Sequence, residues 1–341
     1  MTGLCPGGEA LPGDEAAPKD EQVDGHQGPV PAVVAMGPAQ VRVGTCSWAD
    51  PTLVKQTAWY PKRSMSPAER LGYYATQFSL VEVDATYYRP PSRELARSWA
   101  GRVPPGFCFD VKAYGLLTGH PVDLATLWPD IRDLAPEEAR QRGRVYAHHL
   151  PPEAIEEAWA RFVDALGPLR EAGRLGGILL QYPPWFVPSR ANREELERLQ
   201  GRLGGLLGYA ELRAPGWLAP GERSRTLALL RDLGLAHVVV DAPPSSGLVP
   251  VVEVTQPDLA VVRFHGRSGA TWNARHQSAA ERFRYLYDQD ELLEWVPRAR
   301  ALAERASRVH LLMNNCYQDY GVRNAAQLAR LLLEAAATGS P

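Results

Sequence analysis

Charged residues recur in pairs, two positions apart, near the carboxyl ends of several short apolar segments. That spacing places both members of a pair on the same face of a β-strand. The pairs are Glu82/Asp84, Asp110/Lys112, Glu211/Arg213 and Arg263/His265, and three further segments end in Gln181, Asp241 and Asn314-Asn315. Carboxylates and a histidine held together can exchange protons with a substrate, while lysine and arginine can hold its charge. We therefore interpret these residues as parts of one site.

Apolar residues separate the two members of each pair, which predicts that the charged members point into a shared interior. The separating residues are Val83, Val111, Leu212 and Phe264. Buried charges must compensate one another, so the acids are expected to face the bases. An ion-pair plug that merely closes the interior is the alternative, although Val and Leu would fill such a space at lower cost. The alternation does not decide whether Asn314 or Asn315 points inward.

Residue type assigns roles within this set. Glu82 and Glu211 are the candidate general acid and base, and Lys112 and Arg263 are candidates for holding substrate charge. The catalytic set is Glu82, Asp84, Lys112, Glu211, Asp241 and His265, and the substrate-binding set is Trp48, Tyr87, Gln181, Arg213, Trp217, Arg263, Arg267 and Asn315. The idea requires these side chains to converge on a hollow that solvent can reach.

Aromatic residues follow nearly every apolar segment and suit stacking on a sugar ring or a base. They are Trp48, Tyr87, Tyr88, Tyr114, Trp185, Trp217, Trp272, Tyr317 and Tyr320. Packing of the loops against one another is the simpler interpretation for any one of them. The stretch His265-Gly266-Arg267-Ser268-Gly269 could bind phosphate through glycine N–H groups and Arg267, or could be a plain turn.

A metal site could be assembled from Glu82, Glu211, Asp241 and His265. Only one histidine joins that set, and Lys112 with two arginines already neutralises the acids. We therefore predict no metal ligands and no cofactor, while leaving a divalent metal open.

The elements that must position these residues alternate between short apolar runs and longer stretches with helical periodicity. Eight strands are predicted at 41–46, 80–85, 107–112, 177–182, 208–213, 236–241, 259–265 and 308–315, and helices at 66–78, 151–173, 192–203, 225–234, 291–306 and 325–337. This order predicts an α/β fold, a closed (β/α)8 TIM-type barrel with the charged residues at the functional end. A doubly wound open sheet is the alternative, but the first strand lacks a Gly-rich turn.

Composition bounds the remaining organisation. Residues 1–38 are rich in Gly, Pro and acids and predict a disordered tail, followed by a single barrel domain over 39–338 with an insertion at about 115–150. The formal net charge of −2 argues against nucleic acid as a partner without excluding it. The four cysteines form no CxxC pair, and neither a signal peptide nor an apolar membrane span is evident. We therefore expect a cytoplasmic protein with no membrane partner. Its expected partner is a small-molecule substrate.

Several blocks of the sequence form a recognisable set: VGTCSWADP (43–51), WYP (59–61), VEVDATYYRPPS (81–92), PPGFCFDVKA (104–113), LLQYPPWF (179–186), VVRFHGR (261–267) and NNCYQDYGVRNA (314–325). With these blocks the chain resembles domain-of-unknown-function family 72, the YecE-like proteins. The resemblance covers residues 41 to about 336 and implies a TIM-type barrel without supplying an activity. The family places a histidine after the acid and arginine of the fifth strand, whereas this chain has Ala214 there. If that histidine is catalytic in relatives, this chain is impaired or uses His265 instead.

Three functions remain open from the sequence. The first is a hydrolase, lyase or isomerase that uses acid–base chemistry on a small polar substrate, such as a sugar or its phosphate. The second is a metal-dependent phosphodiester hydrolase acting on nucleic acid. The third is a barrel that binds a ligand or a protein without catalysis. The sequence does not indicate the oligomeric state.

Overall fold

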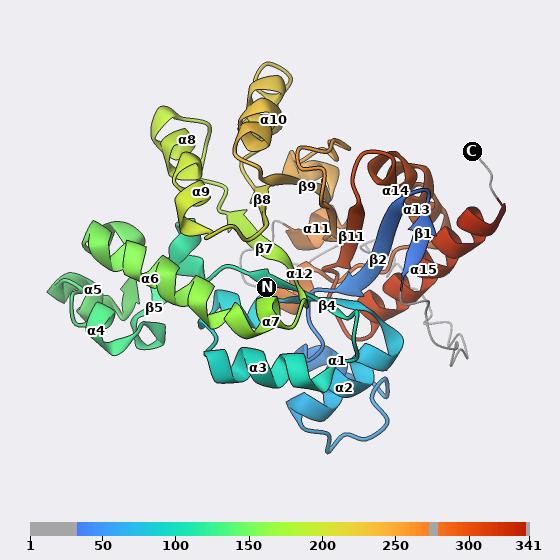
Figure 1. The fold of residues 1–341 in the computed structure, drawn as a ribbon, viewed down its shortest axis with the longest axis horizontal. Coiled ribbons are helices and arrows are strands. Elements are labelled where there is room, and N and C mark those ends of the chain that lie inside the picture. Colours follow the sequence, from blue (N-terminus) through green and yellow to red (C-terminus); the bar gives the residue numbers. More distant parts are fainter. Residues whose placement is uncertain (1–32, 273–278, 339–341) are drawn as a thin grey trace, which may run out of the picture.

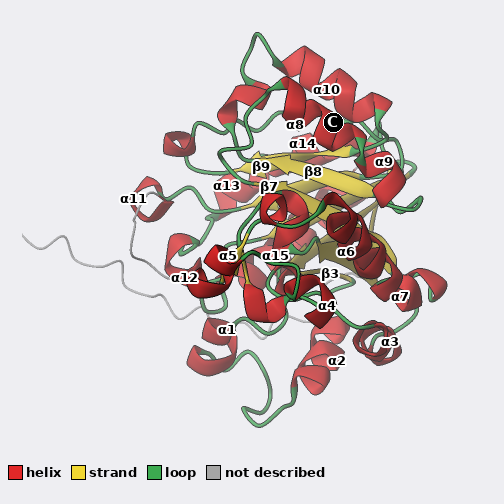
Figure 2. Ribbon diagram, turned by 90° about the vertical axis from the view of Figure 1, so that its left-hand side faces the viewer, coloured by secondary structure: helices red, strands yellow, loops and turns green. Residues whose placement is uncertain are grey.

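Eight parallel strands close into a barrel in the computed structural model, which describes residues 33–272 and 279–338. The barrel strands are β2 (Ala39–Thr45), β3 (Leu80–Val83), β4 (Cys108–Lys112), β7 (Leu175–Tyr182), β8 (Gly208–Leu212), β9 (Ala236–Asp241), β10 (Ala260–Phe264) and β11 (Arg308–Met313). Each of the eight predicted strands corresponds to one of these, so the predicted TIM-type barrel is confirmed. Figure 2 shows the strands at the centre with the helices around them.

Pairing between β2 and β3 closes the barrel, with Gly44 opposite Leu80 and Thr45 opposite Val81. A Cβ at Gly44 would lie 2.1 Å from the carbonyl oxygen of Leu80. No side chain fits at that distance, so the close approach of the two strands requires glycine at this position.

The helices lie mainly between successive barrel strands, as right-handed parallel crossovers require. They are α1 (Pro51–Gln56), α2 (Pro67–Gln77), α3 (Arg93–Arg102), α4 (Pro129–Arg132), α5 (Glu137–Arg142), α6 (Pro152–Ala165), α7 (Gly167–Glu171), α8 (Arg190–Glu197), α9 (Leu199–Arg202), α10 (Arg223–Asp232), α11 (Gly269–Trp272), α12 (Ala279–Arg282), α13 (Gln289–Leu293), α14 (Trp295–Ala303) and α15 (Tyr320–Thr338). Local sequence fixes several starts. Ser66 and Glu69 form a capping box at α2, with Pro67 in the first turn, and Asp288 and Glu291 form another at α13.

One crossover departs from the regular pattern. The chain between β9 and β10 contains a short 3₁₀ turn (Pro244–Ser246) and no α-helix. His237 anchors this segment, because its backbone N–H donates to Thr255 Oγ1 at 2.8 Å and its Nε2 lies 3.1 Å from the carbonyl of Val251. The strand face left without a helix is thereby covered by extended chain.

The predicted insertion between the third and fourth barrel strands is an excursion with its own short elements. It holds β5 (Val122–Asp123) paired antiparallel with β6 (Arg144–Val145), together with α4 and α5. Figure 1 shows it projecting from one side of the barrel, opposite α15. His148 and His149 form a turn directly before α6.

The predicted N-terminal tail, residues 1–38, extends too far along the chain, because ordered structure begins before residue 38. Residues Val34–Met36 form β1, which pairs antiparallel with β2. Val34 and Met36 are buried, so their apolar side chains explain why this part of the predicted tail joins the sheet. Residues 1–32, which hold the rest of that prediction, lie outside the described residues.

Two apolar clusters form the core, one inside the barrel and one between the barrel and its helices. The inner cluster is small and includes Leu80, Leu179, Val238, Val261 and Leu312. The strands therefore bury both faces, as parallel strands with helical crossovers do. Since the inner cluster is short of apolar residues, polar side chains fill much of the barrel interior.

Candidate active site

Arg263 on β10 lies at the centre of the inward-pointing charged residues. Its Nη2 donates to Oε1 of Glu82 at 2.6 Å, and its Nη1 donates to Oε2 of Glu211 at 2.5 Å. All three side chains have 0% exposure. One guanidinium thus joins two carboxylates from β3 and β8, across the barrel interior. The predicted convergence of Glu82, Glu211 and Arg263 is what the structure shows.

Glu211 receives more donors than Glu82. Its Oε1 accepts hydrogen bonds from Nε2 of Gln181, at 2.8 Å, and from Nε of Arg213, while its Oε2 accepts from Arg263. Burial alone would raise the pKa of Glu211, but the Arg213 and Arg263 guanidiniums outweigh burial and hold that pKa well below its usual range. Glu211 is therefore an ionised carboxylate whose lone pairs are already engaged.

Glu82 has the opposite protonation behaviour. Burial raises its pKa to about 8, with Arg263 opposing the shift and the nearby Asp84 carboxylate adding to it. Its second oxygen, Oε2, has no hydrogen-bond partner among the described residues. Two carboxyl groups side by side cannot both ionise freely, so Glu82 holds a proton at neutral pH next to Asp84.

Asp84 and Lys112 form part of the solvent-exposed edge of the cluster. Asp84 lies just beyond β3, in a 3₁₀ turn (Asp84–Tyr87), and its Oδ1 lies 3.5 Å from Nζ of Lys112 and 3.7 Å from Nη2 of Arg263. The side chains of Asp84 and Lys112 are 26% and 13% exposed, and that of Arg213 is 15% exposed. Solvent thus reaches the cluster along this edge, whereas its deeper members are sealed.

His265 is buried beside Glu211. The amide nitrogen Nδ2 of Asn314 lies 2.7 Å from Nδ1 of His265, and the ring's Nε2 lies 3.4 Å from Oε1 of Glu211. Burial, reinforced by the Arg213 guanidinium, lowers the pKa of His265 to about 3. Nη2 of Arg213 also lies 3.3 Å from Nε2 of His265. His265 is therefore a neutral ring held between Asn314, Glu211 and Arg213, and the Trp272 and Phe283 rings lie beside it.

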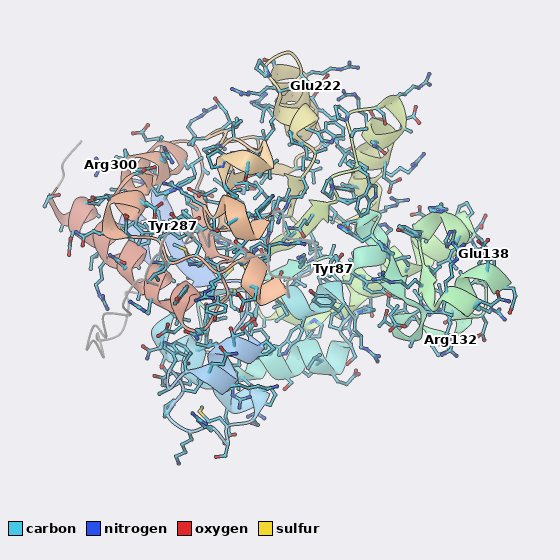
Figure 3. All side chains as sticks on the ribbon, turned by 180° about the vertical axis from the view of Figure 1, so that it is seen from behind. Tyr87, Arg132, Glu138, Glu222, Tyr287 and Arg300 are labelled. Carbon is cyan, nitrogen blue, oxygen red and sulfur yellow. The ribbon has the colours of Figure 1, made fainter. Side chains whose placement is uncertain are left out.

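Aromatic rings border the exposed edge. Nζ of Lys112 lies 4.7 Å from the centre of the Tyr87 ring, and Tyr87 contacts His120 edge to face. His120 in turn contacts Trp185, which is 58% exposed, and Tyr88 is 64% exposed. In Figure 3 Tyr87 lies near the middle of the molecule, between the excursion that carries Arg132 and Glu138 and the region of Tyr287. Tyr88 and Trp185 are the members of the predicted aromatic set that offer open ring surface.

Asp241 and Arg267 lie apart from this cluster, contrary to the roles predicted for them. Asp241 accepts hydrogen bonds from Nε1 of Trp295, at 2.8 Å, and from the Tyr287 hydroxyl, at 3.0 Å. Arg267 forms an ion pair with Asp241 at 2.8 Å and also contacts Glu294. The physical reason is strand alternation: Val240 packs in the inner cluster, so its neighbour Asp241 faces the helices.

Loop seven offers little to a phosphate. The Gly266 N–H donates to the Tyr287 hydroxyl at 2.9 Å, and the Arg267 guanidinium is occupied by carboxylates. The stretch is therefore a turn whose polar groups hold α13 and α14 against the barrel.

Three other predicted substrate-binding residues pack within the structure. Trp217 is fully buried, stacks on Phe186 and donates from Nε1 to the Phe186 carbonyl at 2.5 Å. Trp48 is 9% exposed and donates to the Pro67 carbonyl. Asn315 donates to the Tyr285 carbonyl and to Oδ1 of Asn324, at 2.9 and 2.8 Å. None of the three touches the charged cluster through these contacts.

Asn314 and Cys46 also join the cluster; the sequence left the choice between Asn314 and Asn315 open and did not predict Cys46. Asn314 continues the alternation of His310 and Leu312, so the inward position belongs to Asn314 rather than Asn315. Nη2 of Arg263 lies 3.6 Å from Sγ of Cys46. A lone cysteine after β2 carries no sequence signal.

Donor atoms of Cys46, Glu82 and Asp84 lie within 4.8 Å of one another and could hold a metal ion. The Arg263 guanidinium already contacts all three residues, and Lys112 lies against Asp84. A cation would have to displace those positive charges, so this group fits a metal poorly.

A cleft of about 400 Å³ lies on the outside of the barrel, between α3 and α6. It is lined by Arg93, Trp128 and Arg161 among others, and both arginines are paired with acids. None of the residues that line this cleft belongs to the charged cluster. The most deeply buried part of that cluster resembles the ion-pair plug considered from the sequence, and only its Asp84–Lys112–Arg213 edge is open.

Comparison with known proteins gives consistent matches over nearly the whole chain. Residues 42–341 match the family model described as "Protein of unknown function DUF72". The UPF0759 protein YunF of Bacillus subtilis (strain 168) is 28% identical over 297 residues, which cover 86% of this chain and 94% of the relative. No helix of the described residues is long and apolar enough to cross a membrane.

Two crystal structures share the fold. A DUF72 family protein from Enterococcus faecalis V583 superimposes with a TM-score of 0.69 at 25% identity, covering 86% of this chain and 95% of the other. A DUF72 family protein from Thermotoga maritima MSB8 superimposes with a TM-score of 0.66 at 28% identity, covering 86% and 98%.

Proposed function

The chain belongs to the DUF72 family, and we propose that it is an enzyme in which Glu82 and Asp84 transfer protons on a small, negatively charged polar substrate. The observation that carries this proposal is the division of protons between buried carboxyl groups that share one guanidinium. Glu82 has a pKa of about 8, while the pKa of Glu211 is held well below its usual range. Environments that make the pKa values of neighbouring carboxyl groups differ in this way are typical of acid–base catalysts.

Access and free lone pairs assign the roles within the site. Glu82 is sealed from solvent and holds the proton, so it is the general acid only through Asp84, the solvent-reached carboxylate beside it, which serves as the base. Glu211 was the base expected from the sequence, but its oxygens already accept from Gln181, Arg213 and Arg263. Glu211 therefore acts by fixing the two arginines.

Charge balance favours an anionic substrate. With Glu82 protonated and His265 neutral, the cluster holds three cations against two carboxylates: Lys112, Arg213 and Arg263 against Asp84 and Glu211. The surplus positive charge lies at the exposed edge, where Lys112 and Arg213 can contact a phosphate or carboxylate. The open rings of Tyr88 and Trp185 suit a sugar ring beside it. A sugar phosphate combines both features, and its hydrolysis, elimination or isomerisation needs an acid and a base.

A panel of sugar phosphates and their uncharged parent sugars tests the proposal. Thermal shift with the full chain should find phosphorylated ligands only, and Lys112→Met should abolish the shift. Any turnover found should fall by about 10²–10⁴-fold in Glu82→Gln and in Asp84→Asn, because each removes a proton-transfer group. Binding that persists in Lys112→Met, or turnover that survives Glu82→Gln, would contradict the assignment.

The two other functions give different outcomes in the same experiments. A metal-dependent phosphodiester hydrolase would need a metal ion at Cys46, Glu82 and Asp84, in place of the Arg263 and Lys112 charges, and would cleave nucleic acid only until a chelator is added. A non-catalytic barrel would bind ligand through Lys112 and Arg213 without any turnover in the wild-type chain.

A further inference from the structure

A second group of buried donors lies deeper in the barrel than the proposed active site. Cys108 and Asp110 come from β4 and His310 from β11, and they are 9%, 0% and 0% exposed. One donor atom from each lies within 4.8 Å of the others. Asp110 precedes Lys112 by two residues on the same strand, which places it about 7 Å further from the mouth. The proposed function uses none of these three residues.

The hydrogen bonds of this group are incomplete among the described residues. Nδ1 of His310 lies 2.8 Å from Oδ2 of Asp110, but Oδ1 of Asp110 and Nε2 of His310 have no hydrogen-bond partner. The hydroxyl of Tyr209 on β8 also has none. Burial and then the Asp110 carboxylate raise the pKa of the Tyr209 phenol, so the hydroxyl belongs to the same surroundings. Buried polar atoms without partners are costly and call for a ligand that satisfies them.

Glycine at position 176 makes room for these donors. A Cβ at Gly176 would lie 2.3 Å from Oδ1 of Asp110, 2.6 Å from Sγ of Cys108 and 3.0 Å from Cε1 of His310. The three side chains thus converge on the space that any other residue on β7 would fill. A purely apolar barrel floor would place a side chain there instead.

We propose that Cys108, Asp110 and His310 form a structural site for one transition-metal ion, with zinc as the expected metal. A thiolate, an imidazole and a carboxylate make a mixed donor set that suits zinc and excludes magnesium and calcium, which prefer oxygen alone. Zinc bonds of about 2.0–2.3 Å place tetrahedral ligand atoms roughly 3.5 Å apart, so side-chain rotation has to open the 2.8 Å contact between His310 and Asp110 and bring Cys108 to the ion. The Tyr209 hydroxyl, which also lacks a partner among the described residues, is a candidate for a fourth ligand.

The ion would link β4 to β11 across the barrel. Between these strands lie β3 and β2, whose pairing closes the barrel. A bond network from residue 108 to residue 310 therefore holds together segments from opposite ends of the domain. The site is separate from the mouth cluster and is independent of the proposed enzymatic function.

Cobalt substitution tests the site in the full chain. Because the donors are buried, the metal has to enter as the chain folds, so the protein is produced in cells grown with cobalt or zinc and then purified. We expect one metal ion per chain by elemental analysis. The cobalt form should show a thiolate-to-cobalt charge-transfer band, and the metal-loaded chain should unfold at a higher temperature than chain that has been unfolded and refolded with a chelator.

Matched cysteine variants locate the ion. Cys108→Ser and His310→Gln should each lose the metal, and Cys108→Ser should also lose the band. Gly176→Ala should lose both by filling the space while keeping every donor. Cys316→Ser and Cys5→Ser should keep both. The proposal is wrong if the wild-type chain contains no stoichiometric metal, or if Cys46→Ser loses the band while Cys108→Ser keeps it. If Cys108→Ser does not fold, the charge-transfer band of the wild-type chain and its loss in Gly176→Ala still test whether the ion binds at this site.

Discussion

Two chemically identical side chains, Glu82 and Glu211, share Arg263 and yet behave differently. The Arg263 guanidinium contacts Glu82 and Glu211 at nearly equal distances, 2.6 and 2.5 Å. Glu211 has Arg213 as a second cation, whereas Glu82 has Asp84 as a second anion. The neighbour beyond the shared arginine therefore decides which glutamate keeps its proton. Neither distance to Arg263 would reveal that difference alone.

The proton on Glu82 can be observed directly. Carbon-13 labelling of glutamate side chains should reveal one carboxyl that titrates with a midpoint near the pKa of about 8. Its signal should disappear in Glu82→Gln. In Asp84→Asn the midpoint should move down, because the neighbouring negative charge is gone. A Glu82 signal that titrates in the ordinary glutamate range would remove the basis of the proposed general acid.

At the scale of the elements, the loops after the barrel strands use aromatic residues in two ways. Trp217 follows β8 and is fully buried against Phe186, with Arg193 over its ring at 5.0 Å. Trp185 follows β7 and is 58% exposed. The same sequence pattern, an aromatic after a strand, thus produces a packing residue in one loop and an open ring in the other.

Replacing each of these two tryptophans with alanine should affect stability in one case and ligand binding in the other. Trp217→Ala should lower the free energy of unfolding by about 3–5 kcal/mol, because it leaves a cavity in the loop packing. Trp185→Ala should change it by no more than about 0.5 kcal/mol, and should instead weaken the binding of any ring-bearing ligand. Chemical denaturation of both variants beside the wild type measures this. Equal losses of stability would show that Trp185 is a packing residue as well.

For the whole molecule, the interior charges tie barrel stability to pH. Burial alone would lower the pKa of His310, but the Asp110 carboxylate outweighs burial and raises it from 6.5 to about 9. A raised pKa means that the folded barrel binds this proton more tightly than the unfolded chain does. The resulting stability is fully present below pH 6.5 and is lost as pH rises through about 9. The raised pKa of Glu82 also lowers barrel stability as pH rises, from its ordinary value of 4.5 to about 8.

Unfolding free energies should therefore fall from pH 6 to pH 9.5, with His310 contributing on the order of 3 kcal/mol. The double variant Asp110→Asn/His310→Gln removes this titration. The stability difference between wild type and double variant should shrink across that range. Denaturant unfolding in the presence of a chelator measures it without competition from metal. A constant difference at every pH would show that His310 is not an imidazolium in the folded barrel.

The sequence by itself determined the barrel and most of its interior charges. Eight apolar segments separated by helical stretches leave few arrangements that bury every strand, and spacing by two fixes which face each charge shares. Glu82, Glu211, Arg263 and His265 were predicted together for that reason, and the structure brings them together. Family resemblance led to the same fold.

Where the alternation was ambiguous, only the tertiary structure decided which polar residues face inward. It also decided which residues are exposed. Asp241 and Asn315 lie at or just past strand ends, as Glu211 and Asn314 do, yet each is one position out of phase and bonds to residues outside the barrel interior. His310 looked like part of an apolar run and meets Asp110 from 200 positions away. The physical reason is that exposure, partners and pKa depend on contacts between strands far apart in the chain, and local sequence does not carry those distances.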